Sequence, residues 1–274
     1  MNVMGKSLYF LGLRFWNDRT EGLLQEMDEK GGLLAVPSAP SLGQAADDGL
    51  LMTAYRAADW SVVDGGYVAL ILRMLGKEVV RISGLQLIEK SIANGGTGVV
   101  PMKERKILWV VPNPEEEERI RFYMGGMGYD PDKQGFYRAP FYRSDEEFDD
   151  ETLKQQVREW QPDWIVLCLG GGRQEKLGYY LRRMNPGGEA VAGGEVSEGR
   201  ERGPVIMCTG AAIAFFTGGQ AKIPVWADRL YLGWFCRILE KPSAYIPRYV
   251  KAAWHFPMAL IRERGRWFDI PAAR

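Results

Sequence analysis

The sequence has little histidine or cysteine. His255 is its only histidine, too few for a multi-histidine metal site. Its place in an aromatic stretch is typical of a packing residue, so a histidine-based triad is not expected. The three cysteines, Cys168, Cys208 and Cys236, lie far apart in apolar or aromatic surroundings. They match neither a CxxC metal pattern nor a disulfide framework, which indicates small buried side chains in the reducing cytoplasm.

Net charge and long apolar runs are also absent. The chain has 35 basic and 35 acidic residues, so nothing global indicates nucleic acid binding. No run approaches the roughly 20 apolar residues of a membrane span. Residues 1–16 lack the long apolar region and the cleavage site of a signal peptide. The HExxH, Walker and GxSxG motifs are missing as well. If the protein is an enzyme, its general base should therefore be a carboxylate.

Strand-like and helix-like segments alternate along the chain. This alternation predicts an α/β fold with a mainly parallel, Rossmann-like sheet flanked by helices. The expected strands are 7–13, 33–36, 61–63, 106–111, 164–169 and 205–208. The expected helices are 17–30 (capped by Asn17), 44–57, 67–75, one from Pro114, 150–160 and 175–184.

The domain prediction follows from changes in composition. We expect an α/β catalytic domain over 1–218, with a flexible glycine- and glutamate-rich insertion at about 185–203. A basic, aromatic, helical appendage is expected over 219–274.

A run of three glycines follows the apolar segment 164–169. Gly170, Gly171 and Gly172 lead directly into a segment that begins a helix. In open α/β sheets, the turn from a strand to a helix builds small-molecule sites. Glycine lets backbone N–H groups approach a ligand, and a helix N-terminus favours phosphate. A plain tight turn would have the same pattern, so both interpretations stay open.

Asp64 is the best-placed carboxylate. It follows two valines at an expected strand end and precedes two glycines. Open α/β sheets present ligand-binding groups at the carboxyl ends of their strands, so Asp64 is the candidate general base. The alternative is an aspartate that caps a helix or a turn. The DPD segment at 130–132 has a spacing that elsewhere holds a metal-bound nucleotide sugar, but its turn-rich surroundings favour a plain turn.

The chain after Gly219 differs from the rest. It contains ten lysines and arginines against four aspartates and glutamates, interleaved with ten aromatic residues. This mixture favours an amphipathic segment that lies on an anionic bilayer surface. The alternatives are a packed pair of helices whose aromatic residues are core, and a surface for single-stranded nucleic acid, which the neutral body of the chain disfavours.

Four stretches, in this order, resemble the WecG/TagA/CpsF glycosyltransferases (glycosyltransferase family 26). They are ADWSVVDGGYVALILRMLG, RISGLQL, PDWIVLCLGGGRQE and KIPVWADRLYLGWFCRILEKPSAYIPRY. The resemblance covers about residues 8–250. It implies inverting, metal-independent transfer of a sugar from a UDP-sugar to a polyprenyl-diphosphate-linked saccharide, without a cofactor, in surface polysaccharide synthesis. It also implies a cytoplasmic protein held at the inner face of the cell membrane by its basic tail.

The resemblance also implies partners and site residues. Partners would be the UDP-sugar, the lipid-linked acceptor, an anionic membrane surface and, in a homo-oligomer, further copies of the chain; nucleic acid is not expected. Asp64 falls on the proposed catalytic aspartate, which would deprotonate the acceptor hydroxyl. Arg81 falls on a substrate-positioning arginine, and Gln174 on a donor-site glutamine. The other implied substrate-binding positions are Ser38, Gly170, Gly171, Lys222, Arg237 and Arg248. An arginine pair in the tail would neutralise diphosphate charge as UDP departs.

The chain departs from the family pattern at several of its motifs. A TPN-like turn reads Val36-Pro37-Ser38, and an aspartate is replaced by Ala214; Lys222 and Ala244 replace arginines, and Gly233 replaces a glutamate. These changes leave the sugar open, together with a catalytically degenerate protein that acts in assembly at the membrane surface. A nucleotide-sugar-modifying enzyme is a further alternative, although LGGGRQ lacks the GxGxxG spacing.

Overall fold

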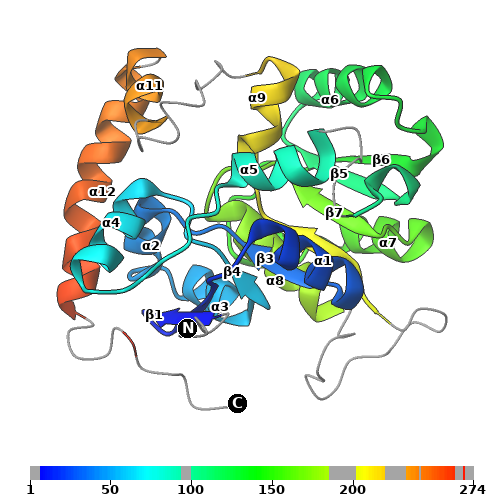
Figure 1. The fold of residues 1–274 in the computed structure, drawn as a ribbon. Coiled ribbons are helices and arrows are strands. Elements are labelled where there is room, and N and C mark those ends of the chain that lie inside the picture. Colours follow the sequence, from blue (N-terminus) through cyan, green and yellow to red (C-terminus); the bar gives the residue numbers. More distant parts are fainter. Residues whose placement is uncertain are drawn as a thin grey trace.

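One mixed sheet forms the centre of the molecule. The computed structural model describes residues 7–93, 100–184, 202–219, 233–240, 242–262 and 268. Within these residues, the sheet has eight strands: β1 (Ser7–Phe10), β2 (Leu13–Trp16), β3 (Gly32–Ala35), β4 (Trp60–Ser61), β5 (Ile107–Val111), β6 (Gln134–Arg138), β7 (Trp164–Leu167) and β8 (Val205–Met207). Their order across the sheet is β1-β2-β4-β3-β8-β7-β5-β6 (Figure 1). Every neighbouring pair is parallel except β1 and β2. The predicted α/β fold is confirmed.

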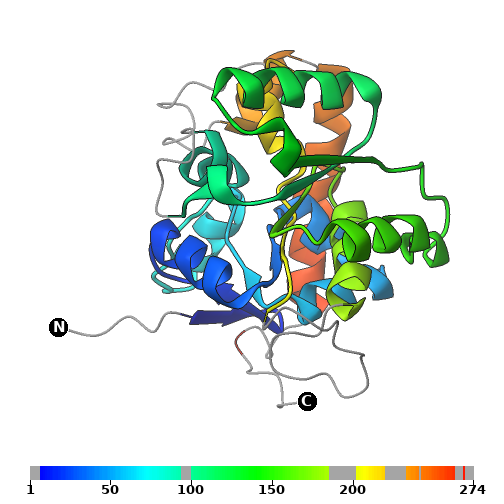
Figure 2. The same ribbon diagram turned by 90° about the vertical axis from the view of Figure 1, so that its right-hand side faces the viewer.

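Helices cover both faces of this sheet, as the two views in Figure 1 and Figure 2 show. Before the last described strand they are α1 (Thr20–Lys30), α2 (Ala39–Ala45), α3 (Gly49–Ala57), α4 (Gly66–Met74), α5 (Gly84–Ile88), α6 (Pro114–Gly126), α7 (Glu151–Trp160) and α8 (Arg173–Met184). After it come α9 (Ala214–Thr217), α11 (Gly233–Glu240) and α12 (Pro242–Arg262).

Alternate residues of the central strands enter two different cores. On β3, Leu34 packs with residues of α1, α5 and α6, whereas Leu33 packs on the opposite face with residues of α7 and α8. Trp109 and Leu108 on β5 divide in the same way. Because both faces of the sheet are covered, these strands contain continuous apolar runs instead of alternating polar and apolar residues.

Three predictions for the N-terminal third were wrong. Residues 7–13 form no single strand, because Leu11 and Gly12 adopt positive φ angles of 54° and 71° and turn the chain into the β1–β2 hairpin. Asn17 does not cap α1; its side chain joins the backbone of Glu78 and Val80. The helix expected over 44–57 is interrupted: α2 ends at Ala45 and α3 begins at Gly49. The Asp48 carboxylate caps α3 by accepting the Leu51 N–H.

The rest of the chain agrees more closely with the predicted elements. Strands β5, β7 and β8 and helices α4, α6 and α7 occur where the pattern predicts them. Strand β6 was not predicted, because its QGFYR sequence lacks the apolar character of the central strands. The DPD segment is a turn, in which the Asp130 carboxylate accepts the Asp132 N–H at 3.0 Å. Cys168, Cys208 and Cys236 are all unpaired. The expected insertion lies outside the described residues, apart from 202 and 203.

The C-terminal helix packs onto the N-terminal part of the fold. Helix α12 lies against α2 at one flank of the molecule (Figure 1). The helices come close at Gly43, where a Cβ atom would lie 3.1 Å from the Cβ of His255. Phe256 and Leu260 are buried in the same core cluster as Leu42. His255 is therefore part of a helix contact, as its aromatic surroundings predicted.

Candidate functional site

The carboxyl edge of the parallel strands collects most of the described residues predicted for the site. Ser38 follows β3 and Asp64 follows β4, each three residues after a register pair formed by Ala35 and Ser61. Gly170 follows β7, and Gly210 follows β8, which lies between β7 and β3. The loops after four adjacent strands therefore meet along one edge, the usual place for a ligand site in such a sheet.

Asp64 is half-buried at this edge and contacts the start of α5. Its Oδ1 accepts the backbone N–H of Gly84 at 3.2 Å. The next turn of α5 is fixed by Ser83, whose hydroxyl accepts the Gln86 N–H at 3.1 Å. This hydrogen bond holds the carboxylate in one orientation at the edge of the sheet.

Open space lies beside Asp64 and beside the glycine turn. A Cβ atom built on Gly65 would meet nothing within 4 Å, and the same holds for Gly170 and Gly171. The fold itself therefore does not require glycine there through crowding. Bare backbone that borders open space allows a ligand to approach its N–H groups.

Backbone pairing places Arg81 beside the segment that contains Asp64. Arg81 and Val63 form a parallel β-bridge, and the Ile82 N–H donates to the Val63 carbonyl at 3.0 Å. The short segment before α5 is thus paired with the segment that leads from β4 to Asp64. This pairing brings the predicted arginine and the predicted base to the same part of the edge.

Gln174 joins two loops from inside the protein. The side chain is only 4% exposed. Its Nε2 donates to the Cys208 carbonyl at 3.2 Å, and its Oε1 accepts the Gly210 N–H at 2.7 Å. Nε2 also donates to Glu175 at 3.1 Å, which uses both amide protons within the protein. This geometry favours a positioning role for Gln174: it ties the turn after β7 to the loop after β8.

Glu175 is a second buried polar residue in this turn, and its role was not predicted from the sequence. It is 1% exposed and accepts the Gly172 N–H at 2.6 Å. Burial raises the pKa of its carboxyl to about 7. Gly172 itself has a φ angle of 89°, which favours glycine. The GGG-x-Q-E pattern could have suggested a tight, buried turn. The contact of the adjacent Gln174 with the Cys208 carbonyl, by contrast, depends on the tertiary fold.

Of the remaining predicted positions, Ser38 has a described side chain, whereas Lys222, Arg237 and Arg248 do not. Ser38 begins α2, and its N–H donates to the Ser41 hydroxyl at 2.9 Å. Lys222 lies outside the described residues. Arg237 and Arg248 belong to α11 and α12, but the description does not extend to their side chains. Ala214, at the position of the family's aspartate, is buried at the start of α9.

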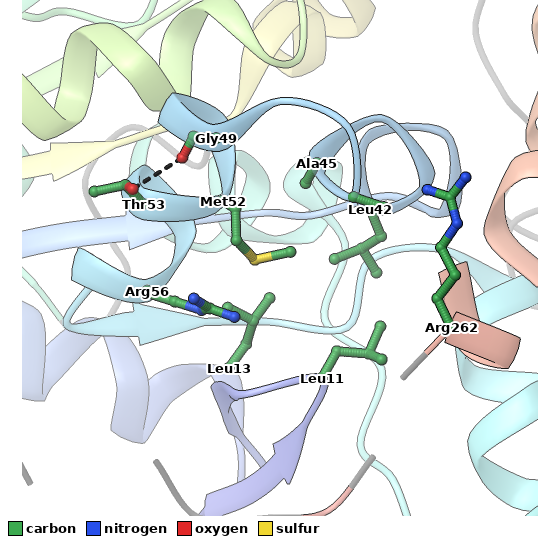
Figure 3. A pocket seen from close by; sticks show the side chains of 10 residues that line it. Leu11, Leu13, Leu42, Ala45, Gly49, Met52, Thr53, Arg56 and Arg262 are labelled. Carbon is green, nitrogen blue, oxygen red and sulfur yellow. Dashed lines mark hydrogen bonds between the residues drawn. The ribbon is translucent and has the colours of Figure 1, made fainter. Parts of the chain in front are cut away.

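A cavity of about 300 Å³ lies elsewhere, between the β1–β2 hairpin, α2, α3 and the end of α12 (Figure 3). Its walls include Leu11, Leu42 and Met52, with the guanidinium groups of Arg56 and Arg262. None of the predicted site residues lines this cavity. Among the described residues, no group of three or more histidine, cysteine, aspartate or glutamate side chains is arranged to hold a metal ion.

The sequence profile of the glycosyl transferase WecG/TagA/CpsF family matches residues 8–268. The chain belongs to this family. No curated protein matches it. Membership implies a glycosyltransferase of cell-surface polysaccharide synthesis, with sugar-nucleotide and lipid-linked acceptor substrates. The match extends through the tail as far as residue 268, so α11 and α12 belong to the family's own sequence.

Proposed function

We propose that this family member is an inverting hexosyltransferase that uses a UDP-sugar and a polyprenyl-diphosphate-linked acceptor. The acceptor hydroxyl attacks the anomeric carbon, its proton passes to the Asp64 carboxylate, and the bond from that carbon to the UDP oxygen breaks. UDP leaves, and the configuration at the anomeric carbon is inverted. A hexose and an N-acetylhexosamine are both compatible with this scheme.

The observation that carries the proposal is the environment of Asp64. Its carboxylate stands at the carboxyl edge of β4, accepts a hydrogen bond from the start of α5, and borders the open space at Gly65. A general base must reach the proton that it removes, and open space beside an ionised carboxylate allows a hydroxyl to approach. The UDP-sugar would lie along the same edge, against the bare backbone of Gly170 and Gly171, which also borders open space.

The leaving diphosphate needs positive charge. Arg81, Lys222, Arg237 and Arg248 are the cations that we assign to this task, in a reaction without a metal cofactor. Guanidinium groups bind phosphate oxygens with paired, charge-assisted hydrogen bonds and stabilise the charge that develops on UDP. Ser38 completes the proposed set of substrate contacts.

We further propose a catalytic domain over residues 1–218 and a membrane-associating appendage over 219–274, at the cytoplasmic face of the cell membrane. Helix α12 has no aspartate or glutamate, which suits an anionic surface. Among the described residues, no helix combines the length and apolar composition that crossing a bilayer requires. Phe256 and Leu260 tie the appendage to the core, so point substitutions test it better than truncation.

A degenerate membrane-surface assembly protein is the second candidate. The observation that favours it is Ala214, which is buried where the family pattern has an aspartate and supplies no polar group. This candidate predicts a folded protein without sugar transfer.

The test is release of UDP from a panel of UDP-hexoses, given a polyprenyl-diphosphate monosaccharide or disaccharide mimic, with and without a metal chelator. Asp64→Asn should lower turnover by about 10²–10⁴-fold, the usual contribution of a general base. Asp130→Asn is the matched control, because this surface-turn aspartate should tolerate the amide. Unchanged turnover in Asp64→Asn would refute the mechanism, and no turnover across the panel would favour the degenerate protein.

A further inference from the structure

The cavity in Figure 3 is separate from the candidate catalytic site. The β1–β2 turn in its wall lies at the amino edge of the parallel strands, because β2 begins at Leu13 and runs parallel to β4. Asp64 lies at the opposite, carboxyl edge, after β4. The volume of about 300 Å³ is at the lower end of the range for small-molecule sites. It corresponds to roughly ten water-sized groups.

Apolar side chains form most of the cavity wall. Leu11, Leu13, Leu42 and Ala45 line it and are otherwise buried in the core. Met52 adds to the wall from α3, and its flexible thioether adapts to ligands of different shape. Leu11 has a φ angle of 54°, which is strained for leucine, and ligand sites are among the places where such strain collects. The turn thus holds a large apolar side chain where its backbone favours glycine.

The positive charge available at this cavity comes from Arg56. Figure 3 shows its guanidinium directed from α3 toward Leu13. Among the described residues Arg56 forms no ion pair, and none of the lining residues is an aspartate or a glutamate. Arg262, by contrast, already pairs with Asp47 at 2.7 Å. One guanidinium that no described carboxylate neutralises matches a monoanion better than a phosphate monoester, whose charge is about −1.5 to −2.

We propose that this cavity binds a monocarboxylate with an apolar body of up to about ten carbon atoms, the chemistry of a medium-chain fatty acid. The carboxylate accepts paired hydrogen bonds from the Arg56 guanidinium, and the apolar body lies against Leu13 and Met52. Because the wall is built from the β1–β2 hairpin, α2 and α3, the ligand joins these elements and stabilises the folded state. This binding is independent of the proposed sugar transfer.

Decanoate is the test ligand, and decanol and decyl phosphate are the comparisons, all below the concentrations at which they form micelles. Calorimetric titration should give the tightest binding for decanoate, which should also raise the unfolding temperature. Arg56→Met removes the charge and keeps an apolar stem, so decanoate should bind at least about tenfold more weakly while decanol binds as before. Arg143→Met replaces an exposed arginine in the loop after β6 and, as the matched control, should leave both affinities unchanged.

Met52→Trp should fill the cavity and abolish the binding of decanoate and decanol alike. No binding of decanoate, equal affinities for decanoate and decanol, or an unchanged affinity for decanoate in Arg56→Met would each overturn the proposal. Tighter binding of decyl phosphate would assign the cavity to phosphate esters instead. A change in the oligomeric mass of Met52→Trp would assign it to a second copy of the chain. Asp64→Asn should bind decanoate as the original protein does, which separates this site from catalysis.

Discussion

Asp64 and Glu175 both follow strands of the sheet at its carboxyl edge, yet their surroundings differ sharply. Asp64 is half-buried and borders open space, whereas Glu175 is 1% exposed and accepts hydrogen bonds from Gly172 and Gln174. The first arrangement suits a group that meets substrate. The second suits a group that holds the turn in shape. A glycine-rich motif can therefore point to residues that hold a site in shape, while the residue that meets substrate lies on another loop.

The largest expected effect on stability comes from removing the Gln174 side chain. Gln174→Ala leaves the Gly210 N–H and the Cys208 carbonyl without their partner, which should lower the free energy of unfolding by about 2–4 kcal/mol. Urea denaturation measures it. Gln155→Ala, on the exposed side of α7, is the control and should stay within about 0.5 kcal/mol. Equal unfolding midpoints for the two variants would contradict the assigned clamp.

The next effect is a pH dependence of stability caused by Glu175. Its pKa in the folded state is about 7, above the ordinary glutamate value of 4.5, so the folded state binds more protons between these pH values. Stability should therefore be highest below pH 4.5 for this group and fall as pH rises through about 7, by at most about 3 kcal/mol.

Glu175→Gln tests this pH dependence, because the amide cannot ionise. We expect the fall in unfolding free energy between pH 5 and pH 8 to shrink in this variant, as measured by denaturant titration at each pH. The idea fails if Glu175→Gln retains the full slope.

The smallest effects distinguish two glycines of the turn after β7. Gly172→Ala forces a φ angle of 89° on alanine and should cost about 1–2 kcal/mol of unfolding free energy. Gly170→Ala meets open space and should change stability by less than about 0.5 kcal/mol, while raising the KM for the UDP-sugar if the donor lies there. A Gly170→Ala protein with an unaltered KM would remove this turn from the donor site.

The sequence predicted the elements whose pattern is local. Strands β5 and β7 are continuous apolar runs because both of their faces are buried, and α6 has a proline at its start and glutamates in its first turn. The β1–β2 hairpin was missed because its turn is Leu11-Gly12, and leucine rarely adopts a positive φ angle. No local pattern predicts that turn.

For the site, the sequence named candidate residues, but it did not predict the surroundings of each side chain. Asp64 and Gln174 were both named, but their environments depend on distant partners. Gly84, 20 residues away, contacts Asp64, and the Cys208 carbonyl, 34 residues away, contacts Gln174. Such contacts appear only when the sheet order is known, because β8 must enter between β3 and β7 before its loop can reach α8.

The contact at Gly43 bears on how the molecule is made. Phe256 and Leu260 share a cluster with Phe10 and Leu42, so one core joins β1 and α2 to α12. A ribosome delivers the N-terminal segments first, and they wait for α12 while the rest is translated. The half of the protein that carries Asp64 is therefore completed only after α12 emerges. A ribosome that stalls before α12 would release a fragment with an unfilled core, a natural target for quality-control proteases.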